Sequence, residues 1–299
     1  MNQHTLKRSY KFNGHGLHTG KPVRVKLCPA PAETGIVFVR TDLGDLEVPA
    51  VATNLYSTRR STNLAVGRAR VGTVEHVLSA LTGMGVDNAY VKLDNVEMPI
   101  LDGSAEAYAS AIAADGIVDQ GVPRKYVTVS KEIIIRKERN GSWIKIAPAK
   151  EFSAEVTIDF ESRVIGKQDI IYTDGDDYAE AVAPCRTFCF LHEIMPQLML
   201  GLIKGGDVNN AIVAVEKPVS KCRMRILSRI LRKPMLEVDA DGYIAEGGLR
   251  FPNECARHKM LDLIGDMRLC GGYPCFRVEA YKPGHGLNTS AVREILKNI

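Results

Sequence analysis

The stretch "TVEHVLSALTGMGVDNAYVKLD", residues 73–94, carries a helix pattern followed by a strand pattern and so indicates the class of fold. Its apolar residues recur at steps of three and four as far as two closing glycines, which predicts an amphipathic helix over 73–85. These apolar residues are Val74, Val77, Leu78, Leu81 and Met84. The chain continues as "NAYVKLD", 88–94, which is typical of a strand.

The regions on either side of this unit contain more elements of both kinds. Runs expected to form strands lie at 23–30, 35–40 and 46–52, and in the second half at 126–137, 142–149 and 153–160. A second helix is expected over "AEAYASAIAADG", 105–116. Because a polar stretch at 118–126 separates two halves that both begin with strands, we predict two α+β domains, 1–124 and 125–299.

The bulk composition is that of a globular protein large enough for two medium cores, with 299 residues and 45% hydrophobic side chains. The net charge of +4 agrees weakly with a phosphate-bearing substrate. Seven cysteines without a C-x-x-C pair indicate neither a disulfide framework nor a cysteine zinc site. The N-terminus lacks a signal-peptide pattern, and the longest apolar run, 198–203, is too short for a membrane span. We expect a cytoplasmic protein without stable membrane insertion.

Residues 216–233 form the most basic part of the chain. A nucleic-acid patch is one interpretation. Apolar residues interleave with the charges at helical spacing, however, which favours the solvated face of a surface helix and no nucleic-acid partner. We interpret the segment as a surface insertion.

The stretch "ECARHKMLDLIGD", 254–266, places His258 and Asp262 one helical turn apart, so both side chains can reach one metal ion. Zinc accepts both ligand types and needs a third protein ligand in a catalytic site. His76 is the natural candidate, because Glu75 beside it suits a general base. The alternatives stay open at this point: a hydrogen bond on a helix surface for the first pair, and a polar helix edge for the second.

Three further motifs contain potential functional residues. His285 stands between two glycines, a context that suits a tight turn presenting an imidazole to a cleft, or an exposed loop histidine. His15 and His18 lie in a Gly-rich stretch that favours a turn over a metal site. Thr187 lies in "CRTFCF", 185–190, which is typical of a strand with its aromatic side chains on one face.

These motifs and their order resemble the UDP-3-O-acyl-N-acetylglucosamine deacetylases, zinc enzymes that commit a precursor to lipid A in Gram-negative bacteria. The resemblance runs along nearly the whole chain. The segments that carry it are "GLHTGKPV", "PAPAETGIVFVRTDL", "TVEHVLSALTGMGVDNAYV", "MPILDGSA", "RTFCF", "GGDVNNAIV", "GLRFPNECARHKMLDLIGD" and "KPGHGLN".

The resemblance implies two similar β-α-α-β domains with their helices packed between the sheets and the active site at the domain interface. It implies one zinc ion per chain, bound by His76, His258 and Asp262. The catalytic residues that it implies are Glu75 as general base, His285 as proton donor, Asp266 as its partner, Thr187 for the oxyanion, and Lys259. The substrate-binding residues that it implies are Lys259, Phe188, Phe190, Leu191 and Gly206.

The substrate implied by the resemblance is UDP-3-O-acyl-N-acetylglucosamine, and we expect the protein to act as a monomer. An apolar insertion near 188–205 is expected to form a channel for the acyl chain, with ordinary core packing as the alternative. The stretches "GLIKGGD" and "PNECARHK" also resemble family members in which a dehydratase domain follows the deacetylase. We expect that this chain either lacks that domain or was cut from a longer protein. A non-catalytic metal-binding protein and a zinc peptidase are the rival interpretations.

The sequence departs from the family pattern at three places. Asp207 stands where Ser is common, and Gly286 stands where Ala is common, but neither is an expected ligand. The basic insertion near 216–245 is longer than in many members.

Overall fold

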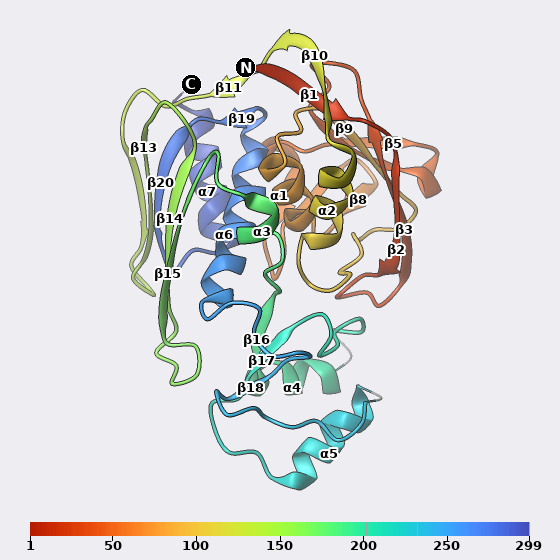
Figure 1. Ribbon diagram of the computed structural model, residues 1–299, viewed down its shortest axis with the longest axis vertical. Helices are drawn as coiled ribbons and strands as arrows, with labels where there is room; N and C mark the ends of the chain where they lie inside the picture. The colour runs from red at the N-terminus through yellow and green to blue at the C-terminus, as the bar shows by residue number, and fades with distance from the viewer. Residues whose placement is uncertain (201–202, 232, 299) are drawn as a thin grey trace.

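The N-terminal half folds into a five-stranded sheet with two helices against one face (Figure 1). The computed structural model describes residues 1–200, 203–231 and 233–298. The strands, in spatial order, are β2 (Tyr10–His15), β3 (Pro22–Pro29), β9 (Ala89–Leu93), β4 (Ile36–Arg40) and β5 (Leu46–Pro49). The helices are α1 (Glu75–Gly83) and α2 (Glu106–Asp115). The helix and strand expected at 73–94 are therefore confirmed as α1 and β9.

The C-terminal half contains a second five-stranded sheet with the same topology. Its strands, in spatial order, are β12 (Ile133–Lys137), β13 (Ser142–Pro148), β20 (Phe276–Tyr281), β14 (Ser153–Asp159) and β15 (Lys167–Thr173). Its helices are α6 (Glu254–Met267) and α7 (His285–Leu296). In both sheets the third and fourth strands pair in parallel, whereas the other neighbours are antiparallel. The predicted α+β fold of two similar domains is confirmed.

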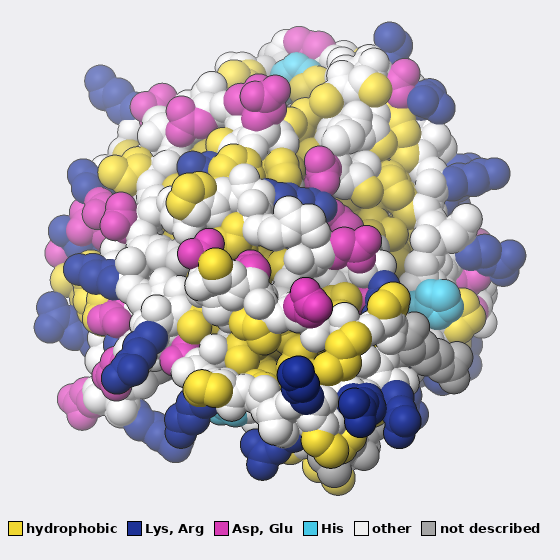
Figure 2. All heavy atoms as spheres, turned by 60° about the horizontal axis from the view of Figure 1, so that its bottom comes forward, with side chains coloured by type: hydrophobic (Ala, Val, Ile, Leu, Met, Phe, Trp, Pro, Cys, Tyr) yellow, Lys and Arg dark blue, Asp and Glu magenta, His cyan; other side chains and the backbone are white. Residues whose placement is uncertain are grey.

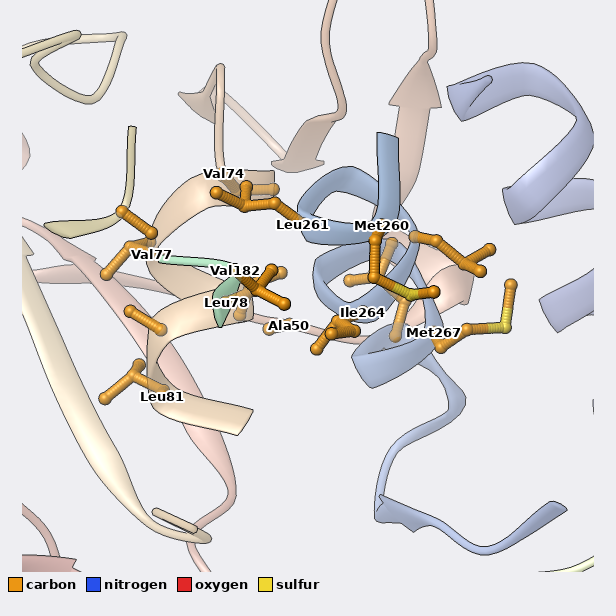
Figure 3. Close-up of a cluster of buried hydrophobic side chains, with 14 of the residues drawn as sticks. Ala50, Val74, Val77, Leu78, Leu81, Val182, Met260, Leu261, Ile264 and Met267 are labelled. Atoms are coloured by element: carbon orange, nitrogen blue, oxygen red, sulfur yellow. The ribbon is translucent and has the colours of Figure 1, made fainter. Parts of the chain in front are cut away.

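The helices of the two halves pack against each other between the two sheets (Figure 1). Buried and half-buried residues alternate along β14, because successive side chains of a strand point to opposite faces. Buried side chains of α1 and α6 meet at the centre of the molecule, where Leu78 of one helix lies near Leu261 and Ile264 of the other (Figure 3). One continuous core therefore joins the two sheets.

The polar stretch at 118–126, expected to separate the halves, is mainly a strand. β10 (Ile117–Pro123) pairs antiparallel with β1 (Asn2–Leu6), and β11 (Tyr126–Val127) pairs parallel with β19 (Tyr273–Pro274). The sequence did not predict this strand, because most residues of β10 are exposed to solvent, so the apolar alternation of a half-buried strand is not present. Between the two strands the buried Arg124 guanidinium donates to the Asp87 carboxylate over 2.8 Å. The division of the chain at residue 124 stays a prediction.

A third, smaller part extends from the lower end of the two-layered body in Figure 1. It contains the sheet of β16 (Phe188–Phe190), β17 (Ile212–Ala214) and β18 (Tyr243–Ile244), together with α4 (Leu191–Met199) and α5 (Lys221–Ile230). Its own core includes Leu191 from α4 and Met224 and Leu227 from α5. The apolar insertion and the basic insertion, which were predicted as two separate segments, thus pack against each other. The surface helix predicted in the basic insertion is α5.

The remaining elements are short. They are β6 (Leu55–Ser57), β7 (Asn63–Val66), β8 (Ala69–Val71), α3 (Tyr178–Ala181), and the 3-10 helices η1 (Thr41–Leu43), η2 (Ala52–Asn54) and η3 (Arg268–Cys270). In the part of the chain that the structure describes, no helix combines the length and the apolar character needed to cross a membrane.

Candidate active site

The site lies where α1 and α6 cross in unusually close contact. A Cβ atom added at Gly265 of α6 would lie 2.1 Å from the carbonyl oxygen of Glu75 in α1, a separation that real atoms do not reach. Glycine at this position therefore lets the two backbones touch. The first turn of α1, with Glu75 and His76, consequently faces the polar side of α6.

Three side chains from the two helices converge into a potential metal-binding group. The Nε2 atoms of His76 and His258 lie 3.9 Å and 3.5 Å from Oδ1 of Asp262, and the potential ligand atoms all lie within 4.8 Å of one another. All three residues are buried. The i, i+4 spacing in α6 thus supplies two members of the group, and the other half of the chain supplies the third.

The hydrogen bonds around this group fit a zinc ion. Oδ1 of Asp262 is buried without a hydrogen-bond partner among the described residues, although buried carboxylate oxygens are normally satisfied. Nδ1 of His258 donates to the carbonyl oxygen of Cys185 over 3.0 Å, which leaves the Nε2 lone pair free for a metal. Burial, helped by the neighbouring His258, lowers the pKa of His76 to about 3, so its imidazole is neutral. Two neutral imidazoles and one carboxylate form a donor set that zinc accepts.

Lys259 lies beside this group and binds the second oxygen of the aspartate. Its Nζ donates to Oδ2 of Asp262 over 2.7 Å and lies 5.4 Å above the ring of Phe188. Burial acts to raise the pKa of Asp262, but the positive charges of Lys259 and His285 outweigh it and hold that pKa well below its usual range. Asp262 is therefore ionised, as a metal ligand must be.

Glu75 occupies the first helical position of α1, next to His76. Its Oε2 accepts the backbone N–H of Thr62 over 3.0 Å, and its Oε1 lies 3.7 Å from Nε2 of His285. Burial, together with the negative charges of Asp262 and Asp266, raises the pKa of Glu75 to about 8, against the opposing charge of His285. A carboxylate with a pKa near neutrality is suited to proton transfer.

His285 is the first residue of α7 and does not lie in a loop, so the predicted tight turn is wrong. The reason is that Gly284, in extended backbone conformation, serves as the N-cap, so the helix starts one residue earlier than the glycine pair suggests. Nδ1 of His285 donates to Oδ2 of Asp266 over 3.0 Å. Burial acts to lower the pKa of His285, but the charges of Asp266, Asp262 and Glu75 raise it to about 10.

Asp266 has two further hydrogen bonds that the sequence did not suggest. Oδ1 accepts the hydroxyl of Thr62 over 2.5 Å, and Oδ2 accepts the amide Nδ2 of Asn288 over 2.9 Å. Thr62 therefore contacts both Glu75, through its backbone, and Asp266, through its side chain. Asn288 could have been found from its i, i+3 spacing to His285, whereas Thr62 precedes α1 in a polar stretch that carries no signal.

The segment that carries Thr187 is fastened to the start of α6 by a buried ion pair. The guanidinium of Arg186 donates to both carboxylate oxygens of Glu254 over 2.9 Å and 3.1 Å. This ion pair positions the residues on both sides of Arg186. They are Cys185, whose carbonyl oxygen accepts the hydrogen bond from His258, and Thr187. The backbone N–H of Thr187 donates to the carbonyl oxygen of Gly103 over 2.8 Å. No pattern in the sequence connected Arg186 with Glu254.

The predicted substrate residues Phe188, Phe190 and Leu191 lie where β16 leads into α4. Phe160 contacts the rings of Phe188 and Phe190 edge-on, each at 5.5 Å between centroids. A cavity of about 930 Å³ beside α4 is lined by Phe190 and Leu191 and reaches residues of α5. The cavity is largely bounded by apolar side chains.

Among the described residues of the expected channel, Phe188 and Leu200 do not line this cavity. Leu200 is 73% exposed at the end of α4, and Leu202 lies outside the described residues. A Cβ atom added at Gly206 would lie 2.6 Å from the side chain of Ile203 and 3.8 Å from that of Leu17, which follows β2.

The Gly-rich stretch 14–20 is partly a strand, because His15 closes β2. The turn that follows is held by Glu97, whose carboxylate accepts the backbone N–H groups of His18 and Thr19, each over 2.9 Å. Neither histidine belongs to the metal-binding group found among the described residues.

Comparison with known proteins identifies close relatives. The model of the UDP-3-O-acyl N-acetylglycosamine deacetylase family matches residues 3–238 and 226–297. The bifunctional enzyme LpxC/FabZ of Porphyromonas gingivalis is 40% identical over 298 residues, which cover 99% of this chain and 64% of that protein. The UDP-3-O-acyl-N-acetylglucosamine deacetylase of Anaeromyxobacter sp. is 40% identical over 296 residues, with 99% and 88% covered. The chain thus spans less than two thirds of the length of the bifunctional relatives.

Proposed function

The chain belongs to the UDP-3-O-acyl N-acetylglycosamine deacetylase family, and from this premise we propose that it hydrolyses the N-acetyl group of UDP-3-O-acyl-N-acetylglucosamine. The products are acetate and the free glucosamine amine, and the reaction commits the precursor to lipid A. The observation that carries the proposal is the hydrogen-bonded His285–Asp266 pair facing Glu75 beside the His76, His258 and Asp262 group.

The proposed cofactor is one zinc ion per chain, held by His76, His258 and Asp262. Zinc in such a site polarises a carbonyl group and lowers the pKa of a water molecule. The unpartnered Oδ1 of Asp262 and the neutral imidazoles support this assignment.

Glu75 is the proposed general base. Its Oε2 is held by the Thr62 N–H, so its Oε1 is directed towards His285 and the reacting centre. There it takes the proton of the attacking water. Its pKa near neutrality allows it to accept this proton and release it again within one turnover.

His285 is the proposed proton donor to the leaving nitrogen. Asp266 accepts the Nδ1–H and so leaves the Nε2–H free to be donated. The negative charges around the imidazole keep it protonated, which an amide requires because a free amide anion is a very poor leaving group. The hydroxyl of Thr187 is proposed to donate to the oxyanion, and Lys259 to contact the substrate.

The acyl chain is proposed to follow Phe188, Phe190 and Leu191 into the cavity beside α4. Support comes from the size and apolar lining of this cavity, because burying an acyl chain gives roughly 0.8 kcal/mol per methylene. The seven cysteines are all free, which supports the cytoplasm as the site of action.

The test is to incubate the purified chain with UDP-3-O-acyl-N-acetylglucosamine and to measure acetate. We expect release that stops after treatment with a chelator and returns when zinc is added. A substrate that binds without any zinc-restored acetate release would instead indicate a non-catalytic binding protein. Cleavage of peptides in place of the sugar amide would indicate a peptidase.

A further inference from the structure

The outer face of α5 is strongly basic, and its cations have no ionic partner in the part of the chain that the structure describes. Four of its ten residues are cationic and exposed, and none is acidic. The cations are Lys221, Arg223, Arg225 and Arg229. No carboxylate of the described chain lies within ion-pairing distance of any of them. Their charges are therefore directed to solvent or to a partner.

The same face also exposes large apolar side chains. Ile226 is 45% exposed and Ile230 is 41% exposed, whereas Met224 and Leu227 on the inner side are buried. Met235, shortly after the helix, is 48% exposed. Figure 2, in which the lower end of Figure 1 comes forward, shows Lys and Arg side chains around exposed hydrophobic atoms at that end. The surface thus combines cations with apolar groups.

Three acidic residues near this face are held by contacts with groups outside α5. The carboxylate of Glu216 accepts the Ser162 hydroxyl, and Asp207 pairs with Lys233 at 3.2 Å. Asp239 accepts the backbone N–H of Tyr243 over 2.7 Å, so it closes a turn. None of these three carboxylates therefore forms an ion pair with a cation of α5.

We propose that the outer face of α5 binds the surface of a membrane that contains anionic lipids. Headgroups of negative charge complement the four cations, and Ile226 and Ile230 can enter the boundary between headgroups and acyl chains, as in helices that lie in a membrane interface. The absence of aromatic side chains from α5 distinguishes this surface from a single-strand nucleic-acid site, where bases stack on aromatic rings beside the cations. The association is peripheral and needs no spanning segment.

This binding mode has a consequence for the cavity beside α4. Ile226 and Leu227 of α5 contribute to its lining, together with Arg223 at its edge. Docking through α5 therefore brings the cavity to the membrane surface, where molecules with acyl chains are concentrated. The surface assignment itself is independent of the proposed deacetylation.

The test is sedimentation of the full chain with vesicles of phosphatidylcholine, alone or mixed equally with phosphatidylglycerol. We expect binding to the mixed vesicles only, weakened by salt. Because each basic residue near an anionic surface strengthens partition about fivefold, the double variant Arg225→Gln/Arg229→Gln should lose about 25-fold. The matched control Arg136→Gln/Arg139→Gln removes two exposed charges from another surface and should bind as the parent chain does.

A second measurement tests the orientation of the surface. Cys222 is the exposed cysteine of the chain and lies on α5. A polarity-sensitive dye on Cys222 should shift to shorter wavelength with mixed vesicles, and the double variant Ile226→Ser/Ile230→Ser should abolish the shift.

Three results would overturn the proposal. They are equal loss of binding in the control variant, tighter binding to a single-stranded oligonucleotide than to vesicles, and a dye shift that follows protein concentration without vesicles. The last would identify a second copy of the chain as the partner.

Discussion

The two halves of the molecule share one topology but contribute unequally to the site. In the first half, α1 supplies Glu75 and His76 from its first turn, and the rest of the helix is packed into the core. In the second half, α6 supplies polar groups over three successive turns, and α7 adds His285 at its first residue. The equivalent first residue of α2 is Glu106, whose partly exposed carboxylate pairs with Arg250 at 3.2 Å. The shared topology of the two halves therefore does not imply that equivalent positions have the same chemical role.

This difference teaches that the interface, and neither half alone, makes the site. Buried ionised groups are stable only when partners surround them. Asp266 of the second half finds one of its partners in Thr62 of the first. Three experiments test how far each half depends on the other.

The largest effect on activity is expected from substituting Glu75 or His76, the two neighbouring residues at the start of α1. Glu75→Gln should lower kcat by about 10²- to 10⁴-fold with the zinc content unchanged, because it removes only the proposed base. His76→Ala should lower the zinc content itself. The measurements are metal analysis and acetate release, with Glu106→Gln as the control at the first residue of α2. Normal zinc binding and turnover in both variants would contradict the division of roles.

The second effect concerns the contact between the halves. Gly265→Ala should lower the free energy of unfolding by about 3 kcal/mol, because the new methyl group would overlap the Glu75 carbonyl and force the backbones apart. Gly286→Ala is the matched control, since its Cβ would meet only Nζ of Lys137 at 3.3 Å and Oγ1 of Thr58 at 3.4 Å, without touching backbone. Chemical denaturation measures both. Equal stability of the two variants would show that α1 and α6 can separate at little cost.

The smallest effect is expected at Thr62, which links the two halves through Asp266. Thr62→Val should lower kcat about tenfold at nearly unchanged KM, because Asp266 loses one hydrogen bond to a charged group. Thr62→Ser keeps the hydroxyl and should restore most of the activity. If valine and serine behave alike, the hydroxyl has no part in positioning Asp266.

Much of the fold could be predicted because the elements are locally encoded. The apolar spacing in 73–85 identified α1, and the i, i+4 step in 254–266 identified His258 and Asp262 as neighbours on the helix that is α6. β10 was missed because its exposed side chains hide the strand pattern. His285 was placed in a turn because a glycine pair gives no sign of which glycine caps the helix.

The sequence by itself determined the helices and strands of the two domains, the pair of candidate ligands on α6 and, through resemblance to a family, the candidate roles. Only the tertiary structure decided which groups meet. Thr62 and Asp266 are 204 residues apart and share a hydrogen bond, and Arg186 reaches Glu254 across 68 residues. The physical reason is that side-chain periodicity acts over a few turns, whereas the partners of a buried charge are chosen by the packing of distant elements, here set by the contact at Gly265.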